Sequence, residues 1–234
     1  AVYQHYIRTE LSNKAKLNNE NKVNEPKLMK KMPRLQKNNV LILGPTGTGK
    51  TLVAKTIADL LNVPYSINDA TTLTEAGYVG EDVEVCLSRL LTCANNDVET
   101  AERGIVFIDE IDKLASLQTT GRDVSGTSVQ QGLLGLLEAR KVSIPGKNGR
   151  AKVEIDTTNI LFILSGAFPG LENIIARRVT ENSFGFHAKE SLQEKRKEDN
   201  ILQIANTEDL RRFGLIPELV GRLPIITATK NLSE

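Results

Sequence analysis

Short, uninterrupted apolar runs mark the predicted strands of this 234-residue chain. Runs of this kind are typical of strands that are buried on both faces of a sheet. Polar or glycine residues follow several of them, and loops are expected there. The predicted strands are Val40–Leu43, Tyr65–Ile67, Ile105–Ile108, Asn159–Leu164 and Leu223–Thr229.

Between these runs, apolar residues return at helical spacing. In Lys50–Leu61 they are Leu52, Val53, Ile57, Leu60 and Leu61, and Asn62 and Pro64 end the pattern. Strands that alternate with helices predict an α/β fold, in which a mostly parallel five-stranded sheet is covered by helices on both faces. Further helices are predicted at 1–11 (with Val2, Tyr6 and Ile7 on one side), at the segment carrying Val85, Leu87, Leu90 and Leu91, at Val129–Leu137 and at Leu171–Arg178.

Polar segments divide the chain into two parts. Ser12–Asn39 is rich in Lys and Asn and is predicted to be a solvated linker, so residues 1–39 form a helix and linker ahead of a domain at 40–234. Leu117–Thr127, Lys141–Lys152 and His187–Asn200 are predicted loops; the second of them is basic.

Composition and net charge argue against several classes of function. The chain is 40% hydrophobic and 25% charged, and its net charge of +1 gives no electrostatic case for binding nucleic acid or an anionic membrane. No apolar run approaches the roughly 20 residues that a bilayer requires. Cys86 and Cys93 are predicted to be small buried hydrophobes in a reducing compartment. Two histidines, His5 and His187, are too few for a zinc site.

The first candidate site is the run Gly44–Thr51, which reads G-x-x-x-x-G-K-T between a strand and a helix. Glycines let backbone N–H groups approach phosphate oxygens, and the helix N-terminus adds positive charge. We expect Lys50 to reach the β- and γ-phosphates of ATP and Thr51 to hold Mg²⁺. The alternative is a glycine-rich turn that binds nothing. The predicted nucleotide contacts are Gly44, Pro45, Thr46, Gly47, Thr48, Gly49, Lys50, Thr51 and Leu52.

Carboxylates follow the predicted strand Ile105–Ile108. Asp109 is assigned to the metal and Glu110 to the polarisation of the attacking water. A solvated acidic turn is the alternative. Ser165 ends another strand, where a polar side chain can sense the γ-phosphate.

Tyr78 and Val79 lie between Gly77 and Gly80, and glycine hinges would present them outward. This segment is one of five sequence blocks, which follow one another along the chain as Gly44–Thr51, Thr71–Asp82, Ile108–Lys113, Arg122–Gly126 and Gly214–Pro224. Together, and in this order, the blocks closely resemble the large domain of the ClpX family of AAA+ protein unfoldases. The resemblance covers nearly the whole chain outside Ser12–Asn39.

This resemblance implies a homo-hexamer that hydrolyses ATP and threads protein substrates through a pore into the ClpP peptidase. It implies that Tyr78, Val79, Arg122, Arg150 and Lys152 serve the pore, and that Arg222 is an arginine finger for the neighbouring subunit. The alternatives are a core position for Tyr78 and a surface salt bridge for Arg222. Phe184, Gly185 and Phe186 resemble the tip that docks on ClpP; a packed hydrophobic turn is the alternative.

Departures from the family pattern add further expectations. The N-terminal zinc domain, the adenine-contacting segment and the helical C-terminal domain of the family have no counterpart here, which predicts a fragment of a longer protein. Ala151 stands inside a loop where many members carry Arg-Lys-His. Asp156–Asn159 and Pro145–Asn148 favour the mitochondrial branch, and therefore the mitochondrial matrix, with the bacterial cytoplasm as the alternative. A chaperone that holds clients without threading them is the competing function.

Overall fold

A five-stranded parallel sheet forms the centre of the computed structural model, which describes residues 2–10, 37–74, 81–115, 124–146, 152–181 and 201–230. The strand order is β2-β5-β8-β1-β9, and every adjacent pair is parallel. The predicted fold class is confirmed. The strands are β1 (Val40–Leu43), β2 (Tyr65–Asp69), β5 (Ile105–Asp109), β8 (Leu161–Gly166) and β9 (Ile225–Ala228).

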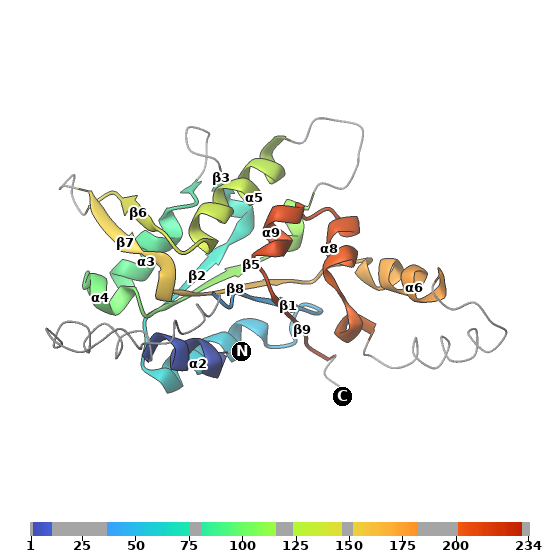
Figure 1. Ribbon diagram of the computed structural model, residues 1–234, viewed down its shortest axis with the longest axis horizontal. Coiled ribbons are helices and arrows are strands. Elements are labelled where there is room, and N and C mark those ends of the chain that lie inside the picture. The colour runs from blue at the N-terminus through green and yellow to red at the C-terminus, as the bar shows by residue number, and fades with distance from the viewer. Residues whose placement is uncertain are drawn as a thin grey trace, which may run out of the picture.

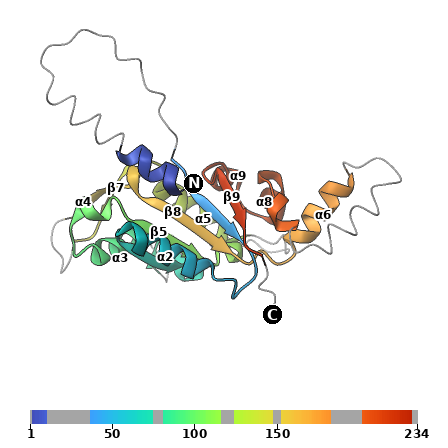
Figure 2. The same cartoon turned by 90° about the horizontal axis from the view of Figure 1, so that it is seen from below.

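Alternate residues of the central strands face two separate apolar layers. On one face, Leu41, Val106 and Phe162 join the larger core, which is covered by helices α3 (Val85–Cys93) and α5 (Val124–Leu137) among others. On the other face, Phe107 and Ile163 pack against α2 (Lys50–Leu61) and the N-terminal helix, residues 2–10. Figures 1 and 2 show these two helices together on one side of the sheet.

Of the apolar residues that predicted α2, only Ile57 packs against the core. Leu52, Val53 and Leu60 are exposed, whereas the buried residues of the helix are Lys50, Ala54 and Ala58. Small side chains let the helix approach the sheet closely. Tertiary packing therefore buries Ala54 and Ala58 rather than the larger apolar residues.

The N-terminal helix docks through polar side chains as well as apolar ones. Val2 and Tyr6 pack on the sheet, but Ile7 is exposed, and His5, Arg8 and Thr9 are buried. His5 Nε2 donates to Asn159 O at 3.0 Å, and Arg8 Nη2 donates to Thr158 O at 2.9 Å. The prediction that Ile7 lies on the packed side is therefore wrong.

The end of the predicted linker is also packed. Lys37 Nζ donates to Thr157 O at 2.7 Å and lies 4.5 Å from the centre of the Phe162 ring, and Asn39 is 1% exposed. The prediction that Ser12–Asn39 is a solvated linker is therefore wrong for Lys37 and Asn39. Burial lowers the pKa of Lys37 to about 7.

Two predicted loops contain regular structure. Lys141–Ile144 is strand β6, which pairs antiparallel with β7 (Val153–Asp156) because Val142, Ile144 and Ile155 alternate into the core. Helix α5 begins at Val124, inside the predicted loop Leu117–Thr127. A Cβ at Gly126 would lie 2.7 Å from Leu114 O, so glycine permits close packing there.

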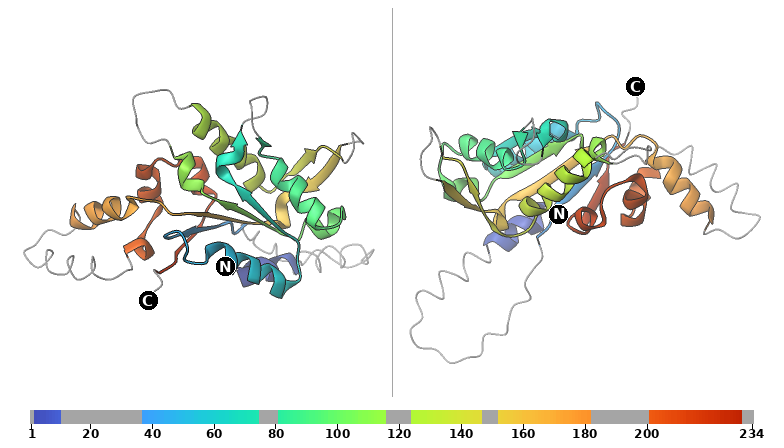
Figure 3. Two further views of the ribbon diagram at one scale, coloured as in Figure 1. Left: turned by 180° about the vertical axis from the view of Figure 1, so that it is seen from behind. Right: turned by 90° about the horizontal axis from the view of Figure 1, so that it is seen from above.

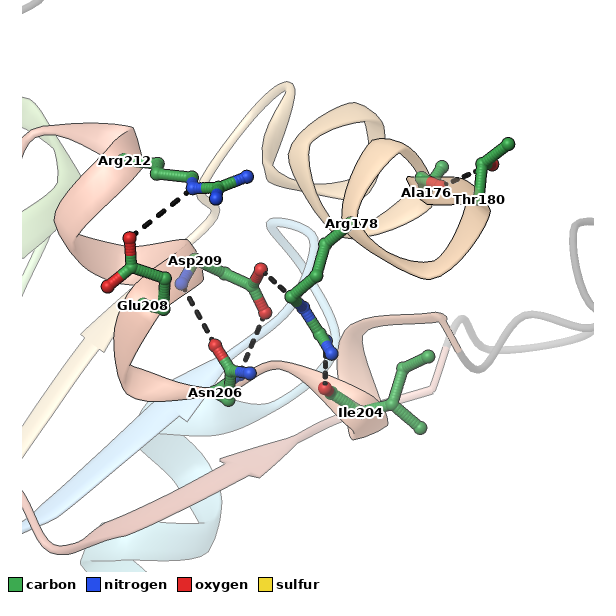
Figure 4. Close-up of polar contacts among 8 residues, drawn as sticks. All are labelled: Ala176, Arg178, Thr180, Ile204, Asn206, Glu208, Asp209 and Arg212. Carbon is green, nitrogen blue, oxygen red and sulfur yellow. Dashed lines mark hydrogen bonds and ion pairs between the residues drawn. The ribbon is translucent and has the colours of Figure 1, made fainter. Parts of the chain in front are cut away.

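Helices α6 (Leu171–Glu181), η5 (Ile201–Ile204) and α8 (Thr207–Phe213) form a helical unit beside the sheet. Arg178 of α6 donates to Asp209 Oδ1 at 2.8 Å and to Ile204 O at 2.8 Å, as Figure 4 shows. Asp209 is fully buried and also forms a capping box with Asn206 at the start of α8. These bonds join α6, η5 and α8.

The remaining elements are short. Residues Asn159 and Ile160 precede β8 rather than belonging to it, because Asp156 Oδ1 caps a 3₁₀ turn at Thr157–Asn159. The short elements are η1 (Ala70–Thr72), β3 (Leu73–Thr74), β4 (Glu81–Asp82), α4 (Val98–Ala101), η2 (Ile111–Leu114), η4 (Thr157–Asn159) and α9 (Pro217–Gly221).

Cys86 is buried as predicted, but Cys93 is exposed, so the prediction that both cysteines are buried is wrong for Cys93. Within the described ranges, no helix has the length and apolar character needed to cross a bilayer.

His5 gives the docked N-terminal helix a testable dependence on pH. Burial, reinforced by Arg8 and Lys37, lowers the pKa of His5 from 6.5 to about 4. The unfolded chain takes up a proton near pH 6.5, whereas the folded chain does so only near pH 4. This residue therefore removes up to about 3 kcal/mol of stability as pH falls through that window.

The measurement is urea denaturation of the parent and of His5→Gln at pH 7 and pH 4. Gln retains a donor for Asn159 O but does not titrate, so the variant should lose less stability on acidification than the parent. Equal losses in both proteins would show that His5 is not the group responsible.

Candidate nucleotide site

The loop between β1 and α2 has the backbone that the phosphate-loop pattern predicts. Gly44, Gly47 and Gly49 have φ of 147°, 85° and 80°. Gly49 is the N-cap of α2 and offers no side-chain hydrogen bond to the helix. The first N–H groups of α2 have no partner within the helix, so they are available to an anion.

Contacts with the end of β9 fix the start of this loop. Thr229 N donates to Leu43 O at 2.8 Å, and the Thr229 hydroxyl lies 2.8 Å from that of Thr48. A Cβ at Gly44 would collide with Thr229 Oγ1. Only glycine fits at this position without displacing Thr229.

Lys50 is held by the loop itself. Its Nζ donates to Gly44 O at 2.7 Å and to Pro45 O at 2.8 Å, and the residue is 8% exposed. Burial lowers the pKa of Lys50, and the charges of Asp109 and Asp112 oppose that shift. The ammonium group therefore lies within the loop that is predicted to cradle phosphate.

Asp109 joins three elements at the carboxyl end of the sheet. Oδ2 accepts a hydrogen bond from Thr51 Oγ1 of α2 at 3.3 Å, and Oδ1 accepts one from Ser165 Oγ of β8 at 2.5 Å. The backbone N–H of Glu110 also donates to Oδ1, at 2.9 Å. The prediction brought Thr51 and Asp109 together as metal ligands, and they are adjacent in the structure.

Ser165 does not face the pocket, where the prediction placed it to sense the γ-phosphate. Its side chain is fully buried and does not line the pocket. It orients the Asp109 carboxylate instead.

A pocket of about 400 Å³ lies over these groups. The sequence prediction missed Asp112, Lys113 and Ala167 as lining residues; the signal was the position of Asp112 and Lys113 directly after Asp109 and Glu110. Asp112 Oδ1 accepts a hydrogen bond from Ala167 N at 3.2 Å and so closes the wall. The pocket is lined by Thr46, Gly47, Gly49, Lys50, Thr51, Leu52, Asp109, Glu110, Asp112, Lys113 and Ala167.

These residues fit a nucleotide with its magnesium ion. The loop supplies open N–H groups and one ammonium group for phosphate, and Thr51 and Asp109 supply two oxygen ligands, which is the ligand type that Mg²⁺ prefers. Mg²⁺ usually keeps several waters and takes few protein ligands. Among the residues described, no cluster of three or more His, Cys, Asp or Glu side chains has metal-binding geometry.

Gly44, Pro45 and Thr48 do not line the pocket but hold the groups that do. The first two provide the carbonyls that hold Lys50, and Thr48 Oγ1 donates to Pro45 O at 2.9 Å. Glu110 has φ of 57° at the N-cap of η2, a conformation that costs about 1–2 kcal/mol for a residue other than glycine. That backbone places an exposed carboxylate at the pocket wall.

Arg222 lies away from this pocket. Its Nη2 is 2.6 Å from Glu138 Oε1, and the two side chains are 52% and 42% exposed. The alternative prediction, a surface salt bridge, is therefore present in the single chain. Lys152 is exposed and lies directly before β7. The other predicted positions lie outside the described residues: Tyr78, Val79, Arg122, Arg150, Phe184, Gly185 and Phe186.

The family described as AAA domain (Cdc48 subfamily) matches residues 35–226, which is most of the chain. The chain belongs to the AAA domain family. This AAA domain is 52% identical over 202 residues to the ATP-dependent Clp protease ATP-binding subunit ClpX of Porphyromonas gingivalis, with 82% of this chain and 49% of that protein covered.

The protein of the same name from Treponema denticola is 49% identical over 208 residues, with 86% of this chain and 50% of that protein covered. The AAA domain described here therefore spans about half the length of these curated relatives.

The two ends of the glycine loop give a paired stability prediction. Gly47→Ala adds a Cβ with nothing within 4 Å, so it should cost only the backbone strain of about 1–2 kcal/mol. Gly44→Ala should cost more, because its Cβ also collides with Thr229 Oγ1. Chemical denaturation measures both changes.

Thr229→Ala supplies the control, since it removes the colliding oxygen. Part of the excess loss in Gly44→Ala should be recovered when the two changes are combined. If the two single glycine variants lose the same stability, Thr229 does not restrict the loop.

Proposed function

We propose that this domain hydrolyses ATP and uses that energy to unfold protein substrates in a homo-hexameric ring that delivers them to the ClpP peptidase. The observation that carries the proposal is the meeting of Thr51, Asp109 and Glu110 beside the Lys50 loop in one pocket. The names of the two curated relatives support an ATP-binding subunit of a Clp protease.

The residues of the pocket divide the chemistry between them. Lys50 exchanges its two carbonyl partners for phosphate oxygens, while the N-terminus of α2 stabilises negative charge. Thr51 and Asp109 would hold Mg²⁺, which when bound supplies positive charge against the β- and γ-phosphates. Glu110 accepts a proton from water as that water attacks the γ-phosphate, while the bond from the γ-phosphorus to the bridging oxygen breaks and ADP leaves.

Arg222 completes the site of the neighbouring subunit in this proposal. Its exposed guanidinium is planar and permanently charged, which suits the charge that develops during phosphoryl transfer. To reach a neighbour, the side chain has to leave Glu138. Exposed ion pairs of this kind contribute little stability, about 0–1 kcal/mol, so the exchange is feasible.

Threading of substrate is assigned to the pore residues that the family resemblance implies. Tyr78 and Val79 grip substrate through apolar contact, with Arg122, Arg150 and Lys152 near the pore, and Phe184–Phe186 dock on the peptidase. Both relatives come from bacteria, which favours the bacterial cytoplasm; the comparisons give no support to the mitochondrial matrix.

The experiment uses the full-length protein with a stably folded client and two site variants. Glu110→Gln should bind ATP and client but lose nearly all ATP hydrolysis and all unfolding, because it removes the base and leaves the binding groups. Lys50→Ala should lose nucleotide binding itself. Calorimetry, phosphate release and loss of client fluorescence measure the three properties.

Lys113→Ala is the control for Lys50→Ala, because it removes another positive charge from the same pocket without touching the phosphate loop. It should retain more ATP binding than Lys50→Ala. A Glu110→Gln protein that still hydrolyses ATP at the parent rate would contradict the assignment of the base. Unfolding of the client by Glu110→Gln would favour a chaperone that does not use hydrolysis.

A further inference from the structure

A buried glutamine connects the nucleotide pocket to the segment that carries Arg222. Gln130 lies in the middle of α5 and is 0% exposed. Its Nε2 donates to Leu114 O at 2.6 Å, and its Oε1 accepts from Ile216 N at 2.8 Å. Only this orientation of the amide satisfies both partners, since the reverse would place donor against donor and acceptor against acceptor.

The two partners of Gln130 belong to different functional segments. Leu114 is the last residue of η2, which follows Glu110 and contains the pocket residues Asp112 and Lys113. Ile216 is the N-cap of α9, and Arg222 is its C-cap, directly after the last helical residue. One side chain therefore spans from the carboxylate side of the pocket to the helix that positions the candidate finger.

The hydrogen bond from Ile216 N to Gln130 Oε1 helps to fix the position of α9. The helix has only five residues, and no side chain of its own caps its start. Its first backbone donor is instead bound by Gln130 from α5. A short helix has little stability of its own, so its place depends on such tertiary contacts.

Helix α5 contacts both segments along its length. It packs against η2 and against α9, and α9 lies beside α5 in Figure 1 and in the right panel of Figure 3. Glu138, just beyond the end of α5, binds the Arg222 side chain. Asn39 Nδ2 donates to Arg222 O at 2.9 Å and so fixes the backbone at the other end of α9.

We propose that Gln130 is a positioning residue that links η2 of a subunit's own nucleotide pocket to the Arg222 which that subunit offers to its neighbour. A displacement of η2 is passed through one rigid amide to the start of α9. This inference rests on the proposed function, because it requires Arg222 to act on a neighbouring subunit. It adds a residue that touches neither nucleotide nor the reacting atoms.

The experiment uses mixed rings of the full-length protein. Glu110→Gln subunits cannot hydrolyse ATP but offer an intact Arg222, whereas Arg222→Ala subunits have an intact pocket but no finger. Hydrolysis in an equal mixture therefore comes from Arg222→Ala pockets beside Glu110→Gln fingers. Gln130→Met, which keeps a long unbranched side chain but no hydrogen bonds, is then added to one partner at a time.

Placed in the finger donor, Gln130→Met should lower kcat of the mixture by about tenfold to a hundredfold, the loss expected from a small misplacement of a catalytic group. The KM for ATP should stay the same. Placed in the pocket donor, the same substitution should change kcat little. Gln131→Met is the matched control: this neighbouring residue is exposed, and its substitution should have no effect in either subunit.

Three outcomes contradict specific claims. No hydrolysis in the mixture with native Gln130 refutes the action of Arg222 on a neighbour, and with it that part of the proposed function. If the mixture with native Gln130 hydrolyses ATP, two further results would refute the role of Gln130 and leave the role of Arg222 intact. One is that Gln130→Met lowers kcat equally in both placements, and the other is that it lowers kcat only in the pocket donor. If thermal melting shows that Gln130→Met does not fold, Gln130→Asn, whose shorter amide cannot reach both partners, must give the same placement effect.

Discussion

The hydrogen bonds to the Asp109 carboxylate are the interaction on which the candidate site depends. They come from α2, from β8 and from the backbone of Glu110, so one side chain sets the distance between the phosphate loop, the buried centre of the sheet and the carboxylate segment. The parallel sheet makes this possible, because β5, β8 and β1 are neighbours and end at the same edge. The candidate site is therefore tied to three elements at the place where phosphate is predicted to bind.

One face of the sheet carries the elements that connect this site to the rest of the molecule. Helix α5 contacts η2, and Glu138, just beyond the end of α5, pairs with Arg222. Both α5 and η2 belong to the larger apolar layer. Helix α2, which begins directly after the phosphate loop, covers the other face together with the N-terminal helix. The fold therefore places α2 and the elements that connect the site with Arg222 on opposite faces of the sheet.

Local chemistry made β1, the glycine loop and α2 predictable, because a dense motif and an apolar run specify them without distant contacts. Asp109 and Glu110 were predicted for the same reason. The buried face of α2, the β6–β7 hairpin and the packing of Lys37 and Asn39 depend on contacts between residues far apart in sequence, which periodicity does not report. The same is true of Gln130, whose bonding partners lie 16 and 86 positions away.

In the proposed site, Asp109 joins the phosphate loop to the metal that accompanies ATP. The most direct measurement is calorimetric binding of a non-hydrolysable ATP analogue to the full-length parent and to Asp109→Asn, each with Mg²⁺ and with EDTA. The parent should bind more weakly in EDTA, whereas Asp109→Asn should bind weakly in both and match the parent once Mg²⁺ is absent. If Asp109→Asn kept the full magnesium dependence of the parent, the account of this site would be wrong.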